Sequence, residues 1–166
     1  MSHVHKISPN LWFDTQAEEA AEFYTGIFPN SQVTRIARYP EAEEDMAHKM
    51  PAGSIMTVDF ELDGQSFVAL NAGPVFKFNE AISFIVHCNN QQEIDQFWEK
   101  LGEGGDPNAQ QCGWLKDKFG VSWQIVPAVL ITLLMDPNPQ KAASVFKAMM
   151  NMKKLDIGAL ERAAEG

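Results

Sequence analysis

Short apolar runs, some alternating with polar residues, predict four strands in the first half of the chain, over residues 7–13, 33–39, 54–62 and 65–71. Asp63-Gly64 joins the last two, and this dipeptide is typical of a two-residue hairpin turn. After the first strand, the polar run that starts at Asp14 or Thr15 predicts the N-cap of a helix ending near Phe28. The predicted order is therefore strand, helix and three strands.

The same pattern recurs later in the chain. Residues 14–24 and 89–98 each follow an apolar strand-like run, open with polar and acidic residues, and close on an aromatic pair. The pairs are Phe23-Tyr24 and Phe97-Trp98. This repetition predicts a duplicated unit with a binding site built between its two halves.

The second half is predicted to contain a helix over 91–101, ended by the glycines of 102–105, and strands over 81–87, 113–116 and 121–126. A full second copy needs one more strand, which would lie in the weakly patterned residues 106–111. Beyond Pro127 the pattern becomes helical and predicts an appended tail with helices over 129–135, 138–151 and 156–164.

Composition narrows the class of protein. The 166 residues are 45% hydrophobic, enough for one globular domain or two small halves sharing a core. A net charge of -9 opposes binding to nucleic acid. No apolar run approaches the ~18 residues of a membrane span, and the N-terminus lacks the apolar core of a secretory signal. With only two cysteines, Cys88 and Cys112, both expected to be packing residues, we expect a cytoplasmic protein.

Several stretches resemble the vicinal oxygen chelate superfamily of glyoxalases, extradiol dioxygenases and antibiotic-resistance proteins, and more narrowly its PhnB-like branch. They are Asn10-Leu11-Trp12-Phe13, Ala21-Glu22-Phe23-Tyr24, Phe60-Glu61-Leu62-Asp63-Gly64-Gln65, residues 69–74, residues 76–84 and Asp117-Lys118-Phe119-Gly120-Val121-Ser122-Trp123-Gln124.

The resemblance implies an α+β fold in which two βαβββ modules, about 7–73 and 81–127, form cupped mixed sheets. These modules would make a single domain over 1–127, with a helical extension over 128–166. Members of this branch are often labelled 3-demethylubiquinone-9 3-methyltransferase-like. A methyltransferase should show a glycine-rich turn between a strand and a helix to hold its nucleoside-bearing cofactor, and the sequence contains no such turn.

Superfamily members bind a divalent metal through inward-facing His, Gln or Glu side chains of the cup. Strand alternation predicts which residues face the cup here. The candidate ligand-binding residues are Asn10, Trp12, Phe67, Asn71, Ser83, Trp114 and Gln124. Gln124 stands where glyoxalase-like members carry a metal-binding glutamate. Because neutral amides and a hydroxyl offset the desolvation of a hard cation poorly, we expect no catalytic metal and no cofactor.

Other interpretations of these residues stay open. Trp12 and Phe67 could instead fill the core, and a metal could use His48 or His87. Asp59 and Glu61 could be inward-facing acid–base groups or part of an exposed face.

Two functions compete. The first is a metal-free binding protein of the bleomycin-resistance type that sequesters a small molecule. The alternative is a metal-dependent isomerase, lyase or dioxygenase whose ligands come from the loop over 41–48. A homodimer is expected, because the tail carries more apolar surface than an appendage can bury on itself. The tail could also cover the outer face of its own sheet.

Overall fold

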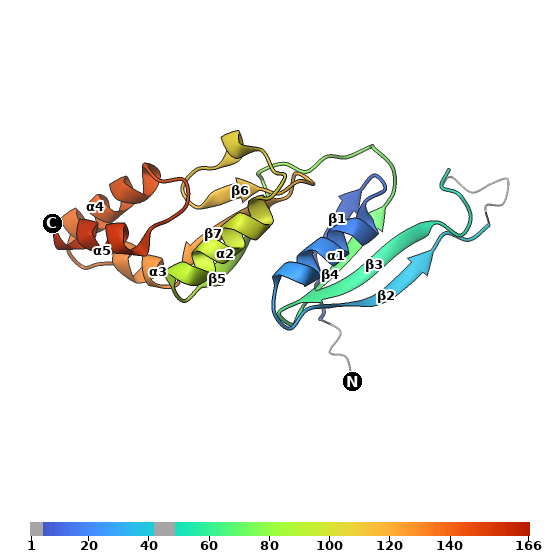
Figure 1. Ribbon diagram of the computed structural model, residues 1–166, viewed down its shortest axis with the longest axis horizontal. Helices are drawn as coiled ribbons and strands as arrows, with labels where there is room; N and C mark the ends of the chain where they lie inside the picture. The colour runs from blue at the N-terminus through green and yellow to red at the C-terminus, as the bar shows by residue number, and fades with distance from the viewer. Residues whose placement is uncertain (1–4, 42–48) are drawn as a thin grey trace. The chain divides into compact units, whose positions relative to one another are not determined.

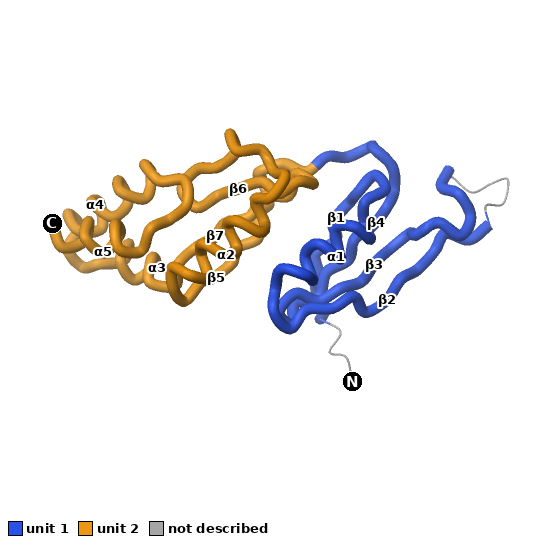
Figure 2. Tube along the Cα trace, viewed as in Figure 1, with its two compact units in different colours: residues 1–77 blue, residues 78–166 orange. Residues whose placement is uncertain are grey.

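The computed structural model describes residues 5–41 and 49–166. The chain forms two compact units, residues 1–77 and 78–166, which Figure 2 colours separately. Each contains one mixed sheet and its own helices, as expected for an α+β protein. Within the described ranges, no helix has the length and apolar character needed to cross a membrane.

The first unit holds a four-stranded sheet and one helix (Figure 1). Its elements are β1 (Asn10–Phe13), α1 (Ala17–Ile27), β2 (Gln32–Arg38), β3 (Ile55–Leu62) and β4 (Gln65–Asn71). The strand order is β1-β4-β3-β2, with β1 parallel to β4 and the other pairs antiparallel. The hairpin turn between β3 and β4 lies at Asp63 and Gly64, both of which have positive φ, as a type I′ turn requires.

Helix α1 packs on β3 and β4 and covers one face of this sheet. On that face Phe60 stacks between Tyr24 of α1 and Phe67 of β4. Leu11 and Phe13 of β1 are also buried. Trp12, between these two residues in sequence, lies on the opposite face, which α1 does not cover.

The second unit has a three-stranded sheet of order β5-β7-β6, with β5 parallel to β7. Its elements up to residue 127 are β5 (Ser83–Cys88), α2 (Gln91–Gly102), the 3₁₀ helix η1 (Pro107–Ala109), β6 (Trp114–Lys116) and β7 (Ser122–Pro127). The fourth strand predicted over 106–111 is wrong. Asp106 caps η1 by accepting a bond from the Asn108 N–H, and Pro107 has no N–H for a strand ladder. Gln111 alone bridges to Trp114.

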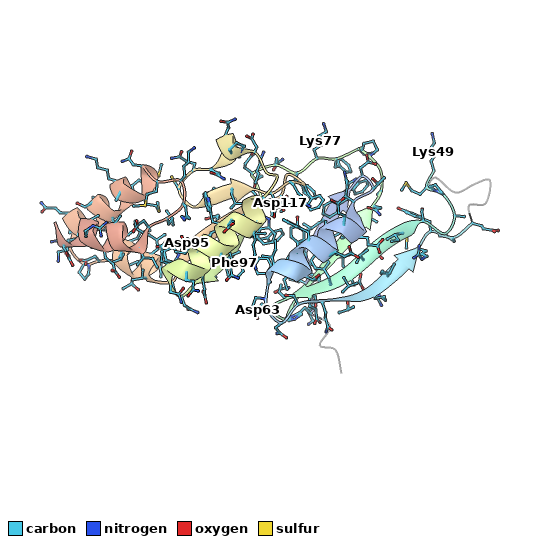
Figure 3. The ribbon with its side chains drawn as sticks, in the orientation of Figure 1. Lys49, Asp63, Lys77, Asp95, Phe97 and Asp117 are labelled. Carbon is cyan, nitrogen blue, oxygen red and sulfur yellow. The ribbon has the colours of Figure 1, made fainter. Side chains whose placement is uncertain are left out.

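A buried carboxylate fixes the turn between β6 and β7 (labelled in Figure 3). Asp117, 2% exposed, accepts hydrogen bonds from the backbone N–H groups of Phe119 and Val121. Its second oxygen accepts from the Trp123 indole at 2.9 Å. These bonds set the start of β7 and hence which of its side chains lie on each face.

The helices beyond residue 127 belong to the second unit. They are α3 (Val129–Leu134), α4 (Pro139–Met150) and α5 (Ile157–Glu165), and they share a core of Leu130, Val145, Leu155 and Leu160. Between α4 and α5, the carbonyls of Met152 and Lys153 accept bonds from the N–H groups of Cys112 and Gly113, both at 2.8 Å. Lys154 pairs with Asp95 of α2; Asp95 is labelled in Figure 3. The two compact units divide at 77/78, between the predicted modules 7–73 and 81–127. The expected domain boundary at 127/128 stays a prediction.

Candidate functional site

The second unit contains a cavity of about 780 Å³. One wall is the sheet face opposite α2, and the other is formed by α3 and the C-terminal end of α4. The lining from the sheet and its flanking segments comprises Glu80, Ile85, His87, Ala109, Gln111, Cys112, Trp114, Gln124, Val126, Pro127 and Ala128. The helices contribute Leu130, Ile131, Leu134, Met149 and Met150.

The strand register brings the central residues of this wall together. Gln124 of β7 lies between Ile85 of β5 and Trp114 of β6, and Val126 lies beside His87. The intervening residues Trp123 and Ile125 are buried on the α2 side. Alternation along β5 and β7 therefore places Ser83, Ile85 and Gln124 on one face, as the sequence predicts.

The polar part of the wall is centred on Gln124. Its Nε2 donates to Ser83 Oγ at 2.9 Å. Ser122, the strand partner of Ser83, is 2% exposed, and its hydroxyl has no hydrogen-bond partner among the described residues. Glu80 pairs with Lys116, and the hydrogen bond from Lys116 holds the pKa of the Glu80 carboxyl below its ordinary value.

Two sulfur-containing residues, Cys112 and Met150, lie together in the cavity lining. Gln111 Nε2 donates to the Met150 carbonyl at 2.8 Å, and Cys112 Sγ lies 3.5 Å from Met150 Sδ. Cys88, by contrast, is fully buried beneath the sheet and does not line the cavity. Burial, with a smaller contribution from the charge of Glu93, raises the pKa of the Cys88 thiol to about 11.

Two candidate residues, Asn10 and Trp12, lie on the open face of the first unit and do not line this cavity. The Trp12 indole donates to the Gly73 carbonyl at 2.9 Å and meets the Phe76 ring edge-on, with centroids 4.9 Å apart. Trp12 is therefore held in place by its own unit.

The same open face carries a smaller cavity of about 430 Å³, which Asp59, Glu61 and Val68 help to line. Asp59 is ion-paired with Arg35 of the neighbouring strand, so this carboxylate is charge-compensated. The expected inward acid–base role of Asp59 and Glu61 stays a prediction.

The predicted orientation of Phe67 and Asn71 is wrong. β1 runs parallel to β4 with Leu11 beside Ala69 and Phe13 beside Asn71, so these residues share the face that α1 covers. The Phe67 ring is buried against Phe60. Alternation within one strand separates its two faces but does not say which face the helix covers.

Asn71 instead caps helix α1. Its Oδ1 accepts from the Ala17 N–H at 2.8 Å, and its Nδ2 donates to the Ile55 carbonyl at 3.2 Å. The predicted caps, Asp14 and Thr15, are not used, because Gln16 holds the N-cap position without a side-chain bond. The acceptor comes from a strand 54 residues away.

No group of three His, Cys, Asp or Glu side chains that could hold a metal occurs within 5–41 and 49–166. His87 lines the cavity and is exposed, whereas His48 and residues 42–47 lie outside the described ranges. Sequence reasoning missed the wall made by Ile131, Leu134 and Met149. Their apolar character was visible, but the tail was expected to be an appendage.

Residues 5–126 match the family model described as 3-demethylubiquinone-9 3-methyltransferase. The chain belongs to this family. A Bacillus cereus structure titled putative 3-demethylubiquinone-9 3-methyltransferase, PhnB protein, is 36% identical, with a TM-score of 0.61 over 75% of this chain and 100% of that chain. The resemblance to the PhnB-like branch is thus confirmed. No curated protein matches the sequence.

A more distant structure also supports the fold. Protein PA1353 from Pseudomonas aeruginosa is 20% identical, with a TM-score of 0.53 over 74% of this chain and 97% of that chain. A lactoylglutathione lyase from Agrobacterium tumefaciens is 15% identical, with a TM-score of 0.43 over 78% and 98% of the two chains. The first of these supports the fold alone, and the second is too dissimilar in structure to support an argument about the site.

Proposed function

We propose that this protein binds a small, largely apolar molecule in the cavity of its second unit. The supporting observation is the cavity itself, whose volume of about 780 Å³ is within the range of small-molecule sites. Its wall is mostly apolar, with Trp114 beside the Gln124 amide. Such a wall suits a planar or aliphatic body held by hydrophobic contact and oriented by a few hydrogen bonds.

We further propose that this binding needs no metal. Gln124, at the centre of the wall, is neutral, and its amide is bonded to the neutral hydroxyl of Ser83. Neutral donors of this kind bind a hard divalent cation weakly. The metal-dependent isomerase, lyase or dioxygenase expected as an alternative would need ligands from elsewhere, and its expected source, the loop over 41–48, is described only at residue 41.

The methyltransferase in the family's description gains no support from the turns that precede helices α1 and α2. Residues 14–16 connect β1 to α1, and residues 89–90 connect β5 to α2. Neither turn contains the glycines that let a backbone approach a nucleotide-like cofactor closely. Ligand sequestration therefore remains our proposal over methyl transfer.

Homodimerisation also stays a proposal. Several tail residues that suggested it are buried within the second unit, including Val145, Leu155 and Leu160. Ile131, Met135 and Phe146 remain more than half exposed and give the proposal its support. Light scattering during size-exclusion chromatography would give twice the chain mass of 18.5 kDa if the dimer forms, and the single-chain mass otherwise.

The binding proposal can be tested with 2-ethylnaphthalene as an apolar probe in a fluorescence titration. We expect a dissociation constant on the order of tens of micromolar for a ligand of this size. Ile85→Trp should abolish binding, because Ile85 lines the cavity and the larger indole side chain would fill it. Since Ile85 is 51% exposed, this substitution should not disturb the core.

A matched control is Ile36→Trp, since Ile36 is a 41% exposed strand residue of the first unit. This variant should bind the probe as the unsubstituted protein does. Unchanged binding by Ile85→Trp, or no binding by the unsubstituted protein, would overturn the proposal.

A further inference from the structure

A small polar row lies on the sheet face that forms the cavity wall, and its member Gln124 lines the cavity. Ser83 and Ser122 are paired across the parallel strands β5 and β7, and Gln124 is two residues further along β7 on the same face. Because Gln124 Nε2 bonds to Ser83 Oγ, its side chain runs diagonally back toward this row. The amide is therefore directed toward the strand position at which Ser83 and Ser122 pair.

The Ser122 hydroxyl is the anomalous member of the row. It is buried and has no hydrogen-bond partner among the described residues. An unpaired buried hydroxyl is destabilising, and buried polar groups in proteins are nearly always bonded. A serine hydroxyl can donate one hydrogen bond and accept two. Ser122 is thus a buried hydroxyl without a partner, two residues along β7 from Gln124, which lines the cavity.

The charged residues near the row, Lys116 and Glu80, indicate which kind of polar ligand group could bind there. Lys116, the strand partner of Ser122 on its other side, is ion-paired with Glu80, which itself lines the cavity. The pair is neutral overall, so it brings no net positive charge to the row for an anionic ligand group. Gln124 and Ser122 both offer hydrogen-bond donors, so the row fits an uncharged acceptor oxygen.

We propose that this row is a subsite for the carbonyl oxygen of a neutral, largely apolar ligand. The Gln124 amide turns from Ser83 to donate to that oxygen, which uncovers Ser122 for a second donation to it. Ser83 is a positioning residue that holds the amide beside the row in the unliganded protein. This inference rests on the proposed function, because it assigns the polar end of the same cavity.

The test compares three probes with one ring system on the full chain: 2-acetylnaphthalene, 2-ethylnaphthalene and 2-naphthoate. The ketone should bind about 3- to 10-fold more tightly than the hydrocarbon, the net effect expected of one hydrogen bond. The anionic 2-naphthoate should bind more weakly than the ketone. Ser122→Ala should remove most of the advantage of the ketone and leave the affinity for 2-ethylnaphthalene unchanged.

Ser66→Ala is the matched control, because Ser66 is a strand serine of the first unit and does not line this cavity. It should leave all three affinities unchanged. Ser122→Ala removes a hydroxyl without a partner, so its thermal midpoint should not fall. Gln124→Leu gives a second variant in which the ketone and the hydrocarbon should bind alike.

The outcomes separate the two proposals. Binding of 2-ethylnaphthalene without preference for the ketone, or a ketone preference that survives both substitutions, would overturn the subsite and leave the apolar site standing. Tightest binding by 2-naphthoate would overturn the assignment of a neutral ligand. If none of the probes bound, the proposed function would fail, and the subsite with it.

Discussion

Asn71 at the end of β4 accepts a hydrogen bond from the backbone N–H of Ala17, the first residue of α1, at 2.8 Å. A strand residue therefore accepts the hydrogen bond that a side chain at the N-cap position usually accepts. The Asn71 carbonyl also accepts from the Tyr39 hydroxyl. One buried asparagine thus joins the start of α1 to the end of β4 and to the residue that follows β2.

Asn71→Ala should lower the free energy of unfolding by about 1–3 kcal/mol, because it removes the cap and leaves the Ile55 carbonyl without its amide donor. Urea denaturation measures this loss. Asn10→Ala, an exposed strand residue of the same unit, should change stability by less than about 0.5 kcal/mol. Equal effects of the two substitutions would show that Asn71 does not stabilise the fold in this way.

Asp117→Ala should destabilise the second unit by about 2–4 kcal/mol, since three donors lose a buried carboxylate. Asp106→Ala serves as the control, because that carboxylate makes an exposed turn bond to Asn108. It should cost only about 1 kcal/mol. The Trp123 indole N–H resonance should shift in the Asp117 variant alone, and an unshifted resonance would contradict the assigned bond.

The Asp95 carboxyl provides a prediction about pH. Hydrogen bonds from Lys154, and then from Gln91, hold the pKa of Asp95 below its ordinary value. A pKa that is lower in the folded state gives a stabilising effect above the unfolded-state value of about 3.9, lost as the pH falls through the folded-state pKa. The effect should be small and sensitive to salt, because the pair is solvent-exposed.

Lys154→Ala should therefore raise the pKa of Asp95, as followed by NMR titration of its carboxyl carbon. Lys153→Ala removes the same charge one residue away and should leave the titration nearly unchanged. If both variants shifted the pKa equally, a diffuse field rather than the Lys154 contact would be responsible.

The two cysteines should differ in reactivity toward a disulfide reagent such as dithionitrobenzoate. With its pKa raised to about 11 by burial, Cys88 should be roughly 0.1% thiolate at pH 8 and is also shielded from solvent. Cys112 is partly exposed at the cavity edge. One thiol should react quickly in the native protein, and Cys112→Ser should remove that phase. A fast phase that persisted in Cys112→Ser would contradict the burial of Cys88.

Local signals in the sequence predicted most of the fold. Asp63-Gly64 and the apolar runs on either side gave β4 its observed bounds, because the hairpin needs positive φ only at the two turn positions. Helix α4 begins at Pro139 after Asn138, as the capping pattern predicted. The strand expected over 106–111 was inferred from the repeat rather than from its own residues, and Pro107 is incompatible with it.

The site was predictable only in part. Alternation placed Ser83 and Gln124 on one face because their strands pair in one small sheet, and Trp114, also expected at the site, is the strand partner of Gln124. It could not assign the faces of β4, since that choice depends on the parallel pairing with β1, which lies more than 50 residues away in sequence. The helical wall with Ile131 and Leu134 depends likewise on packing between distant segments.

The most direct test of the ligand site is a methyl NMR titration of the full chain with 2-ethylnaphthalene. We predict saturable shifts for the methyl groups of Ile85, Val126 and Ile131, which line the cavity of the second unit. The methyl groups of Ile36 and Val33, exposed on β2 of the first unit, should not move. Shifts confined to the first unit, or none at saturating probe, would contradict the account.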